Sequence, residues 1–226
     1  MLRLARTVEP RTIAQIADDM VPTRRALLTA GEKLIGDSGI EGIALHRVAQ
    51  MAGQANKYAV QYHFGGLEGF IEAIFKVRLR RVEARRQALL DIAIESDLMA
   101  DLPALLETVF LPMAEQVDEE GRHSYARFRL QHKSRPLHGP ENPVLIAPRA
   151  GATETAFRAI AAAADISLTD TVWRMMLLDS MLIAALIDRD NAAIRGHVAP
   201  PLEATVAGMT ATAAAAIRIP IWPPRQ

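Results

Sequence analysis

The feature that most constrains this chain is the stretch 39–70, GIEGIALHRVAQMAGQANKYAVQYHFGGLEGF, in which glycines interrupt two short helical patterns. Residues 44–52 carry apolar side chains at helical spacing, so one face of this segment is expected to lie inward. Gly53 then permits a turn that residues with a Cβ atom resist. A second compact helical segment covers 56–64, and a long helix is expected from about Leu67. The side chains expected to face inward are Leu45, Val48, Ala49, Ala52, Ala59, Val60 and Phe64.

The outward face of the second segment offers many hydrogen-bonding groups and little net charge. Such a face suits a helix in the major groove of DNA, where it contacts both phosphates and base edges. A small three-helix core with a polar outside is the alternative that the pattern leaves open. The outward residues are Asn56, Lys57, Tyr58, Gln61, Tyr62 and His63.

Taken in order, these residues resemble the DNA-binding domain of the TetR family of bacterial transcriptional regulators. The resemblance covers residues 23–74. The segment 52–65 is similar to a branch of the family with the pattern Ala-Gly-x-x-Asn-x-x-Ala-aliphatic-Gln-Tyr-His-Phe-Gly. No single residue is specific, but the ordered set indicates a helix-turn-helix domain. Other residues that fit the family pattern are Arg25, Ala30, Gly39, Glu68 and Phe70.

Two positions depart from the family pattern. Ala44 stands where the family usually has Ser or Thr, and it has no side-chain oxygen to cap the following helix. Leu67 stands where relatives usually carry a lysine that meets a phosphate. Weaker binding or an unusual operator is the expected consequence.

The resemblance implies a homodimeric regulator, acting as a repressor, that binds a near-palindromic operator in double-stranded DNA. The recognition helices, expected at 56–63, would enter successive major grooves. We expect Gln61, Tyr58 and Asn56 to contact base edges and the others to contact phosphates or sugars. The complete set of expected DNA-binding residues is His46, Arg47, Asn56, Lys57, Tyr58, Gln61, Tyr62 and His63.

Composition indicates an all-α protein, because alanine is abundant, aromatic residues are few and no stretch alternates β-branched residues. Cysteine is absent, which excludes disulfides and cysteine metal sites. The N-terminus lacks the apolar core of a signal peptide, and the longest apolar run, 175–187, is too short to span a bilayer. We therefore expect a cytoplasmic protein without membrane contact.

Charge is distributed unevenly although the net charge is zero. Residues 1–90 hold 14 Lys and Arg against 9 Asp and Glu, whereas residues 91–226 hold 12 against 17. A basic front half suits a domain that faces phosphates, and an acidic rear half suits one that faces solvent or a partner.

Three regions are predicted: a flexible N-terminal arm at 1–21, a helix-turn-helix domain at 22–69, and a larger helical ligand-binding and dimerisation domain at 70–226. Thr23 is expected to cap the first helix of the middle region. In the long helix that follows, Lys76 and Arg78 lie near the start and could approach DNA, whereas the arginines further along are expected to form a solvated face. These are Arg80, Arg81, Arg85 and Arg86.

The rear region is predicted to contain successive helices. Pro112 should kink or divide a helix at 102–120. A helix at 167–189 is apolar almost all round and must be covered on both sides, while 202–218 carries small residues at fourfold spacing. We favour a four-helix homodimer interface over a close contact within one chain. Its expected residues are Trp173, Leu177, Met181, Ala204, Gly208, Ala211, Thr212 and Ala215.

The family resemblance also implies a pocket for an unknown small-molecule effector, mainly apolar, in the rear region. Each candidate could equally be an ordinary core or surface residue. The candidates are Phe110, Met113, Tyr125, Phe128, His132, Arg174 and Met175.

Enzymatic function is not indicated. The pair Glu120 and His123 forms a single Glu-x-x-His, whereas a di-iron bundle needs two copies and further carboxylates. No phosphate-binding glycine loop or nucleophile elbow occurs, and we expect no metal and no cofactor. The alternative function is a helical ligand-sensing or protein-interaction protein with weakened or lost DNA binding, which Ala44 and Leu67 keep open.

Overall fold

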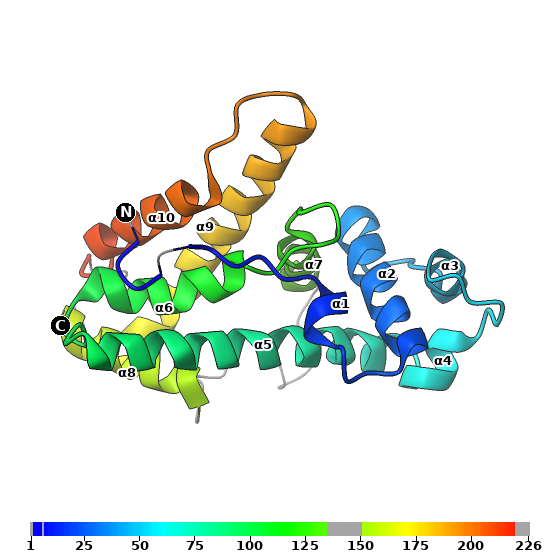
Figure 1. Cartoon of the computed structure of the whole chain (residues 1–226), viewed down its shortest axis with the longest axis horizontal. Coiled ribbons are helices and arrows are strands. Elements are labelled where there is room, and N and C mark those ends of the chain that lie inside the picture. The colour runs from blue at the N-terminus through cyan, green and yellow to red at the C-terminus, as the bar shows by residue number, and fades with distance from the viewer. Residues whose placement is uncertain (1, 6, 135–150, 220–226) are drawn as a thin grey trace, which may run out of the picture. The chain divides into compact units, whose positions relative to one another are not determined.

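The computed structural model describes residues 2–5, 7–134 and 151–219, and these fold into α-helices without a β-strand (Figure 1). The predicted all-α class is therefore confirmed for the described part of the chain. Its helices are α1 (Ile13–Ile16), α2 (Pro22–Ser38), α3 (Leu45–Met51), α4 (Ala59–Phe64), α5 (Leu67–Glu95), α6 (Leu102–Ala114), α7 (Ser124–Lys133), α8 (Gly151–Ala164), α9 (Leu168–Ile194) and α10 (Leu202–Ala216). None of these helices is long and apolar enough to cross a membrane.

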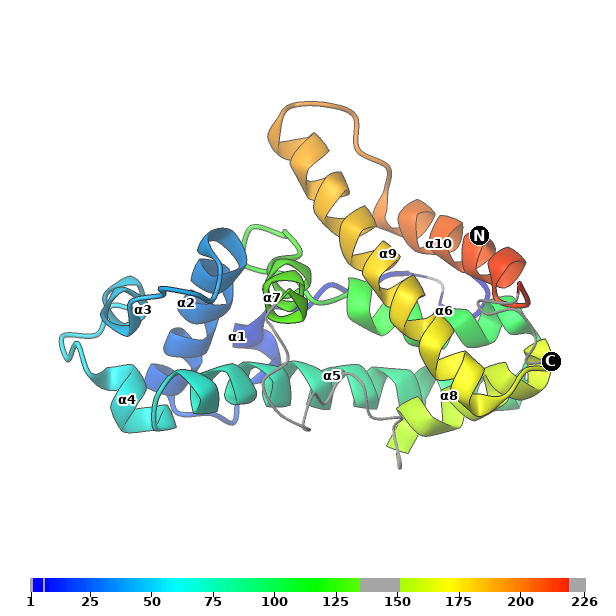
Figure 2. The same cartoon turned by 180° about the vertical axis from the view of Figure 1, so that it is seen from behind.

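The chain divides into two compact units. The head unit comprises Glu9–Val82 and Glu115–Pro136, and the body unit comprises Met1–Val8, Glu83–Ala114 and Leu137–Gln226. This division differs from the predicted one, because the boundary falls within α5 and α7 groups with the helix-turn-helix pattern (Figure 2).

Helices α2 and α5 of the head unit pack closely through a glycine. A Cβ atom built on Gly31 would lie 2.1 Å from Cζ of the buried Phe70 ring, so any other residue there would force the ring to move. At the start of α2, Val21 is the N-cap, with no side-chain hydrogen bond, and Pro22 is the first helical residue. The predicted cap at Thr23 is wrong, because the helix has already begun at Pro22, whose ring fixes a helical φ angle.

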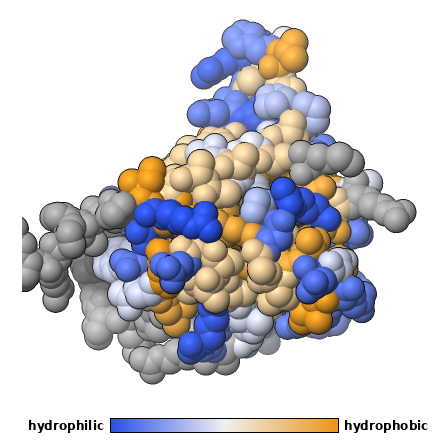
Figure 3. All heavy atoms as spheres, turned by 90° about the vertical axis from the view of Figure 1, so that its left-hand side faces the viewer, coloured by the Kyte–Doolittle hydropathy of each residue, from blue (hydrophilic) through white to orange (hydrophobic). Residues whose placement is uncertain are grey.

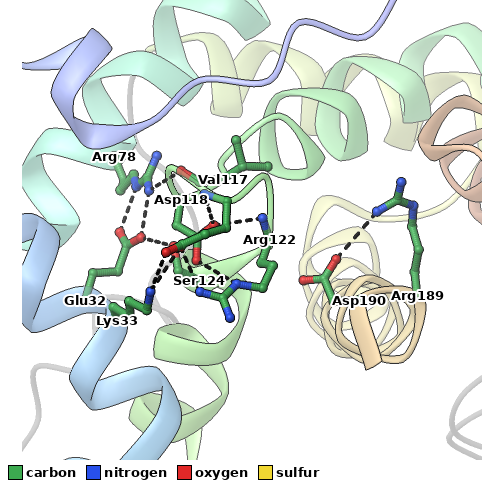
Figure 4. A network of polar contacts seen from close by, with 10 residues as sticks. Glu32, Lys33, Arg78, Val117, Asp118, Arg122, Ser124, Arg189 and Asp190 are labelled. Atoms are coloured by element: carbon green, nitrogen blue, oxygen red, sulfur yellow. Dashed lines mark hydrogen bonds and ion pairs between the residues drawn. The ribbon is translucent and has the colours of Figure 1, made fainter. Parts of the chain in front are cut away.

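Arg78 on α5 is buried in the head unit and is not presented to DNA, contrary to the expectation for the start of this helix. Only 1% of Arg78 is exposed, and its Nε and Nη2 donate to the Glu32 carboxylate at 2.7 and 2.6 Å. Nη2 also donates to the carbonyl oxygen of Val117 at 3.0 Å (Figure 4). Nη1 donates to the carbonyl oxygen of Arg11 at 3.0 Å and to Oε1 of Gln116 at 3.3 Å. Such a complete set of partners offsets the cost of burying a guanidinium.

The N-terminal leader is packed rather than free, unlike the flexible arm that we expected at 1–21. In the body unit the buried Glu107 carboxylate accepts the backbone N–H groups of Arg3, Leu4 and Ala5 at 2.6–3.1 Å. In the head unit Arg11 forms an isolated β-bridge with Gln116. Backbone donors that pair with buried acceptors hold an irregular segment in place. The helix that follows begins with a capping box between Thr12 and Gln15, and its Ile13 side chain is buried.

Helix α6 is the most buried helix of the body unit and packs against α8, α9 and α10. The helix is not divided at Pro112. Proline has no N–H for the carbonyl oxygen of Thr108, and Nε of the buried Arg86 donates to that oxygen instead, at 3.2 Å. Arg86 is therefore an exception to the predicted solvated face.

The helices that surround α6 have distinct starts. Ser167 caps α9, as predicted, by accepting the N–H of Asp170 at 3.0 Å. The Glu83 carboxylate accepts the backbone N–H of Thr153 at 3.1 Å and so serves the first turn of α8. Helices α9 and α10 then pack against each other.

Candidate nucleic-acid interface

Helix α3 and the turn after it have the geometry that the glycine pattern predicts. Ala44 is the N-cap of α3 and makes no side-chain capping bond, as its lack of an oxygen requires. Gly53 has φ +68°, and no atom would lie within 4 Å of an added Cβ, so backbone conformation rather than space favours glycine. The N–H of Gln54 donates to the Ala49 carbonyl oxygen at 2.9 Å, which closes the helix end.

The recognition segment begins as a turn and becomes a helix later than expected. Oδ1 of Asn56 accepts the N–H of Tyr58 at 2.9 Å, and the helix begins at Ala59 with Tyr58 as N-cap. The prediction of a helix over 56–63 is therefore too long at its start, because the asparagine offers the backbone an alternative to helical bonding. Buried Ala59 and Val60 anchor α4 to the head unit.

Seven of the eight expected DNA-binding residues are exposed. Tyr62 is 81% exposed and Tyr58 is 63% exposed. Neither Arg47 nor Lys57 forms an ion pair with any residue that the structure describes, although Nζ of Lys57 lies 5.0 Å from the Tyr58 ring. The exposed set is His46, Arg47, Asn56, Lys57, Tyr58, Gln61 and Tyr62.

His63 differs from the others because it is half-buried where α4 ends. Its backbone oxygen accepts Nη1 of Arg24 at 2.9 Å, and its ring centroid lies 4.9 Å from that of Tyr62. Arg24 also lies over the Phe64 ring, 4.7 Å from its centroid. Arg24 thus clamps the end of α4 onto the start of α2, a role that sequence spacing could not reveal because the partners are 39 residues apart.

The junction between α4 and α5 is sterically tight. An added Cβ on Gly69 would lie 2.2 Å from the backbone oxygen of Phe64, so a larger residue would displace the end of α4. The Phe64 and Phe70 rings meet edge to face at 5.0 Å between centroids. These contacts fix the direction in which α4 leaves the core, and so where Gln61 and Tyr62 are presented.

The seven effector-pocket candidates fall into both units. Tyr125, Phe128 and His132 belong to the head unit, where all three rings pack against Phe75 at 4.8–6.2 Å between centroids. The other four belong to the body unit, in which Phe110, Arg174 and Met175 are buried and Met113 is half-buried. The structure therefore does not gather the seven in one compact unit, and a ligand role for each stays a prediction.

All eight residues expected in a dimer interface are exposed on the chain by itself. Leu177 is 56% exposed, and Trp173 and Met181 lie one turn to either side of it on α9. Figure 3 shows that hydrophobic residues cover much of one face of the molecule, with separate hydrophilic side chains between them. On α10 the exposed residues are small: Ala204, Gly208, Ala211, Thr212 and Ala215.

Comparison with known proteins does not extend these observations. No protein-family model matches the chain, and no curated protein matches it.

Proposed function

We propose that this protein is a DNA-binding transcriptional regulator of the TetR type, which acts as a repressor and binds a near-palindromic operator as a homodimer. The observation that carries the proposal is the exposed face of α3, the turn and α4, where seven of the eight expected contact residues are exposed. The hypothesis also draws on the resemblance of residues 23–74 to that family.

The side chains on this face differ in the contacts they suit. The amides of Asn56 and Gln61 both donate and accept hydrogen bonds, as the reading of base edges requires. Arg47 and Lys57 carry charges without a carboxylate partner among the described residues, which suits phosphates. Tyr62 supplies a hydroxyl that can reach either a phosphate or a sugar.

A homodimer follows from the same hypothesis, because paired half-sites are read through a two-fold axis. The exposed apolar face of α9 and the exposed small residues of α10 offer a surface on which two copies could pack closely. A small, mainly apolar effector would then release DNA only by binding more tightly to the protein conformation that mismatches the operator.

The decisive experiment is selection of bound duplexes from a random-sequence DNA pool, followed by sequencing. An enriched inverted repeat is the expected result, and loss of enrichment from a folded dimer at low salt would refute the proposal. Replacement of Gln61 by alanine should relax the preference at one position of each half-site. Equal loss of affinity for all sequences would instead assign Gln61 to the DNA backbone.

A protein-binding head is the second candidate, and the exposure of Tyr58 and Tyr62 favours it, because tyrosine is enriched at protein interfaces. Salt dependence separates the two functions. Binding to phosphates weakens steeply as salt rises, whereas an apolar protein contact does not.

A further inference from the structure

The head unit contains a groove that the proposed DNA-binding function does not use. Its volume is about 460 Å³, which lies within the range of small-molecule sites. One face of α2 forms part of the groove, together with residues of α1, the end of α3 and the loop 118–120. The expected effector pocket lies in the rear region of the sequence, so none of its candidates predicts this groove.

Two polar side chains on α2 line the groove without partners. Arg25 and Thr29 lie one helical turn apart on the same face, and both are half-buried. Neither side chain makes a hydrogen bond or an ion pair with any residue that the structure describes. A guanidinium and a hydroxyl at this spacing suit a carboxylate, which accepts several hydrogen bonds at once.

The other charges along the groove are already paired or well solvated. Glu32 is held by Arg78, and Lys33 donates to Glu120 at 2.8 Å (Figure 4). Glu119 has no partner among the described residues, but it is exposed, so solvent screens its attraction for a cation. Half-buried Arg25 therefore favours an anionic ligand over a cationic one.

Apolar and small side chains form much of the remaining lining. Ile13 comes from α1, Ala26 and Ala30 come from α2, and Met51 ends α3. A methionine adapts its shape to an apolar ligand, and the alanines leave room beside it. From this combination we infer that the groove binds a small organic acid, with its carboxylate on Arg25 and Thr29 and its apolar body against these side chains.

Occupancy of the groove should also affect DNA binding, a consequence that rests on the proposed function. Met51 and Ala52 line the groove and directly precede Gly53, the turn toward the recognition helix. The carboxylate of the bound acid neutralises the charge of Arg25, and its apolar body displaces the end of α3. The acid should therefore weaken DNA binding. By linkage, DNA must then weaken binding of the acid by the same factor.

Isothermal titration calorimetry of the full chain without DNA tests the site independently of the proposed function. The probes share one chain length and differ in charge: octanoate, octan-1-ol and octylammonium. Octanoate should bind most tightly, and Arg25→Gln should weaken it by about tenfold, which corresponds to one charge-assisted hydrogen bond. Binding of octan-1-ol should not change in that variant.

Two further variants locate the binding. Ala26→Leu should abolish octanoate binding by filling the groove, with its thermal unfolding midpoint measured to establish that it folds. Arg195→Gln, an exposed arginine of the body unit without a side-chain partner among the described residues, is the matched control and should bind as the parent does.

The inference fails on any of three results. These are no saturable heat with octanoate, a preference for octylammonium, or an unchanged octanoate affinity in Arg25→Gln. If that substitution lowers only DNA affinity and its salt dependence, Arg25 is a phosphate contact and the groove proposal is overturned. Octanoate binding without any selected DNA sequence would uphold the groove and refute the proposed function alone.

Discussion

The head and body units each bury an arginine of α5, and the two arginines serve different purposes. Arg78 in the head unit pairs with a buried carboxylate and also holds the backbone oxygens of two distant segments. Arg86 in the body unit pairs with the partly exposed Glu83 at 2.6 Å and also donates to the oxygen that Pro112 leaves open in α6. Both units thus bury a charge with several partners, but the arginine of the head unit pairs with a fully buried carboxylate, whereas the arginine of the body unit satisfies a backbone acceptor that a proline cannot.

The largest effect is expected for Arg78→Ala, with Arg80→Ala as its matched control on the same helix. Removal of Arg78 leaves the Glu32 carboxylate buried without its charge partner and should lower the free energy of unfolding by about 3–5 kcal/mol. Arg80 forms an exposed pair with Asp19, so its loss should change stability by less than about 1 kcal/mol. Denaturant titration followed by circular dichroism measures both, and equal losses would contradict the contrast.

Gly31→Ala tests close packing in the head unit instead of charge. The new methyl group would overlap the Phe70 ring, which must move, and we expect a loss of about 1–3 kcal/mol in the free energy of unfolding. Gly208→Ala in the body unit is the comparison, because no atom of the described part of its own chain lies within 4 Å of an added Cβ. In the monomer that substitution should stabilise α10 by about 0.5–1 kcal/mol through helix propensity. In the proposed homodimer, where Gly208 is an expected interface residue, it should weaken association instead. An unchanged free energy of unfolding for Gly31→Ala would show that the Phe70 ring moves aside without cost.

A double-mutant cycle between Arg86 and Pro112 tests whether the arginine compensates for the proline in the body unit. Arg86→Met removes the donor to the Thr108 oxygen together with the ion pair to Glu83, and should cost about 1–3 kcal/mol in stability. Pro112→Ala restores a backbone N–H for that oxygen, so Arg86→Met should cost less in this background. Purely additive effects would exclude the coupling.

The smallest effect concerns pH and the exposed Glu120 in the head unit. A hydrogen bond from Lys33, followed by one from Arg122, lowers the pKa of Glu120 from 4.5 to about 2. A lowered pKa in the folded state stabilises the protein above the unfolded-state pKa, and this contribution disappears as pH falls from 4.5 through 2. Glu120→Gln should remove a few tenths of a kcal/mol at neutral pH, because solvent screens exposed pairs.

The same titration at acid pH checks the sign of that prediction. The stability difference between the parent and Glu120→Gln should vanish below pH 2, where both side chains are neutral. A difference that persists there would show that hydrogen bonding of the neutral carboxyl group, and not its charge, is responsible.

The candidate interface was largely predictable from sequence because its signals are local. Gly53 adopts the positive φ that the glycine pattern implies, and the exposure of Gln61 and Tyr62 beside buried Ala59 and Val60 follows from helical spacing. The start of α4 was not predicted, because the Asn56 side chain competes with the helix for the backbone. The hydrogen bond from Arg24 to the carbonyl oxygen of His63 was not predicted either, because the two residues lie far apart in the sequence.

The amino-acid sequence by itself determined the helical class, the glycine turn before α4 and the exposed polar face, because periodicity and backbone preference act over a few residues. The tertiary structure alone decided that Arg78 and Arg86 are buried, that the leader is anchored on Glu107, and that Arg25 lines a groove. The physical reason is the same for the two buried arginines and for the leader. Whether a polar group is buried depends on partners that can satisfy it, and in this protein those partners come from distant parts of the chain.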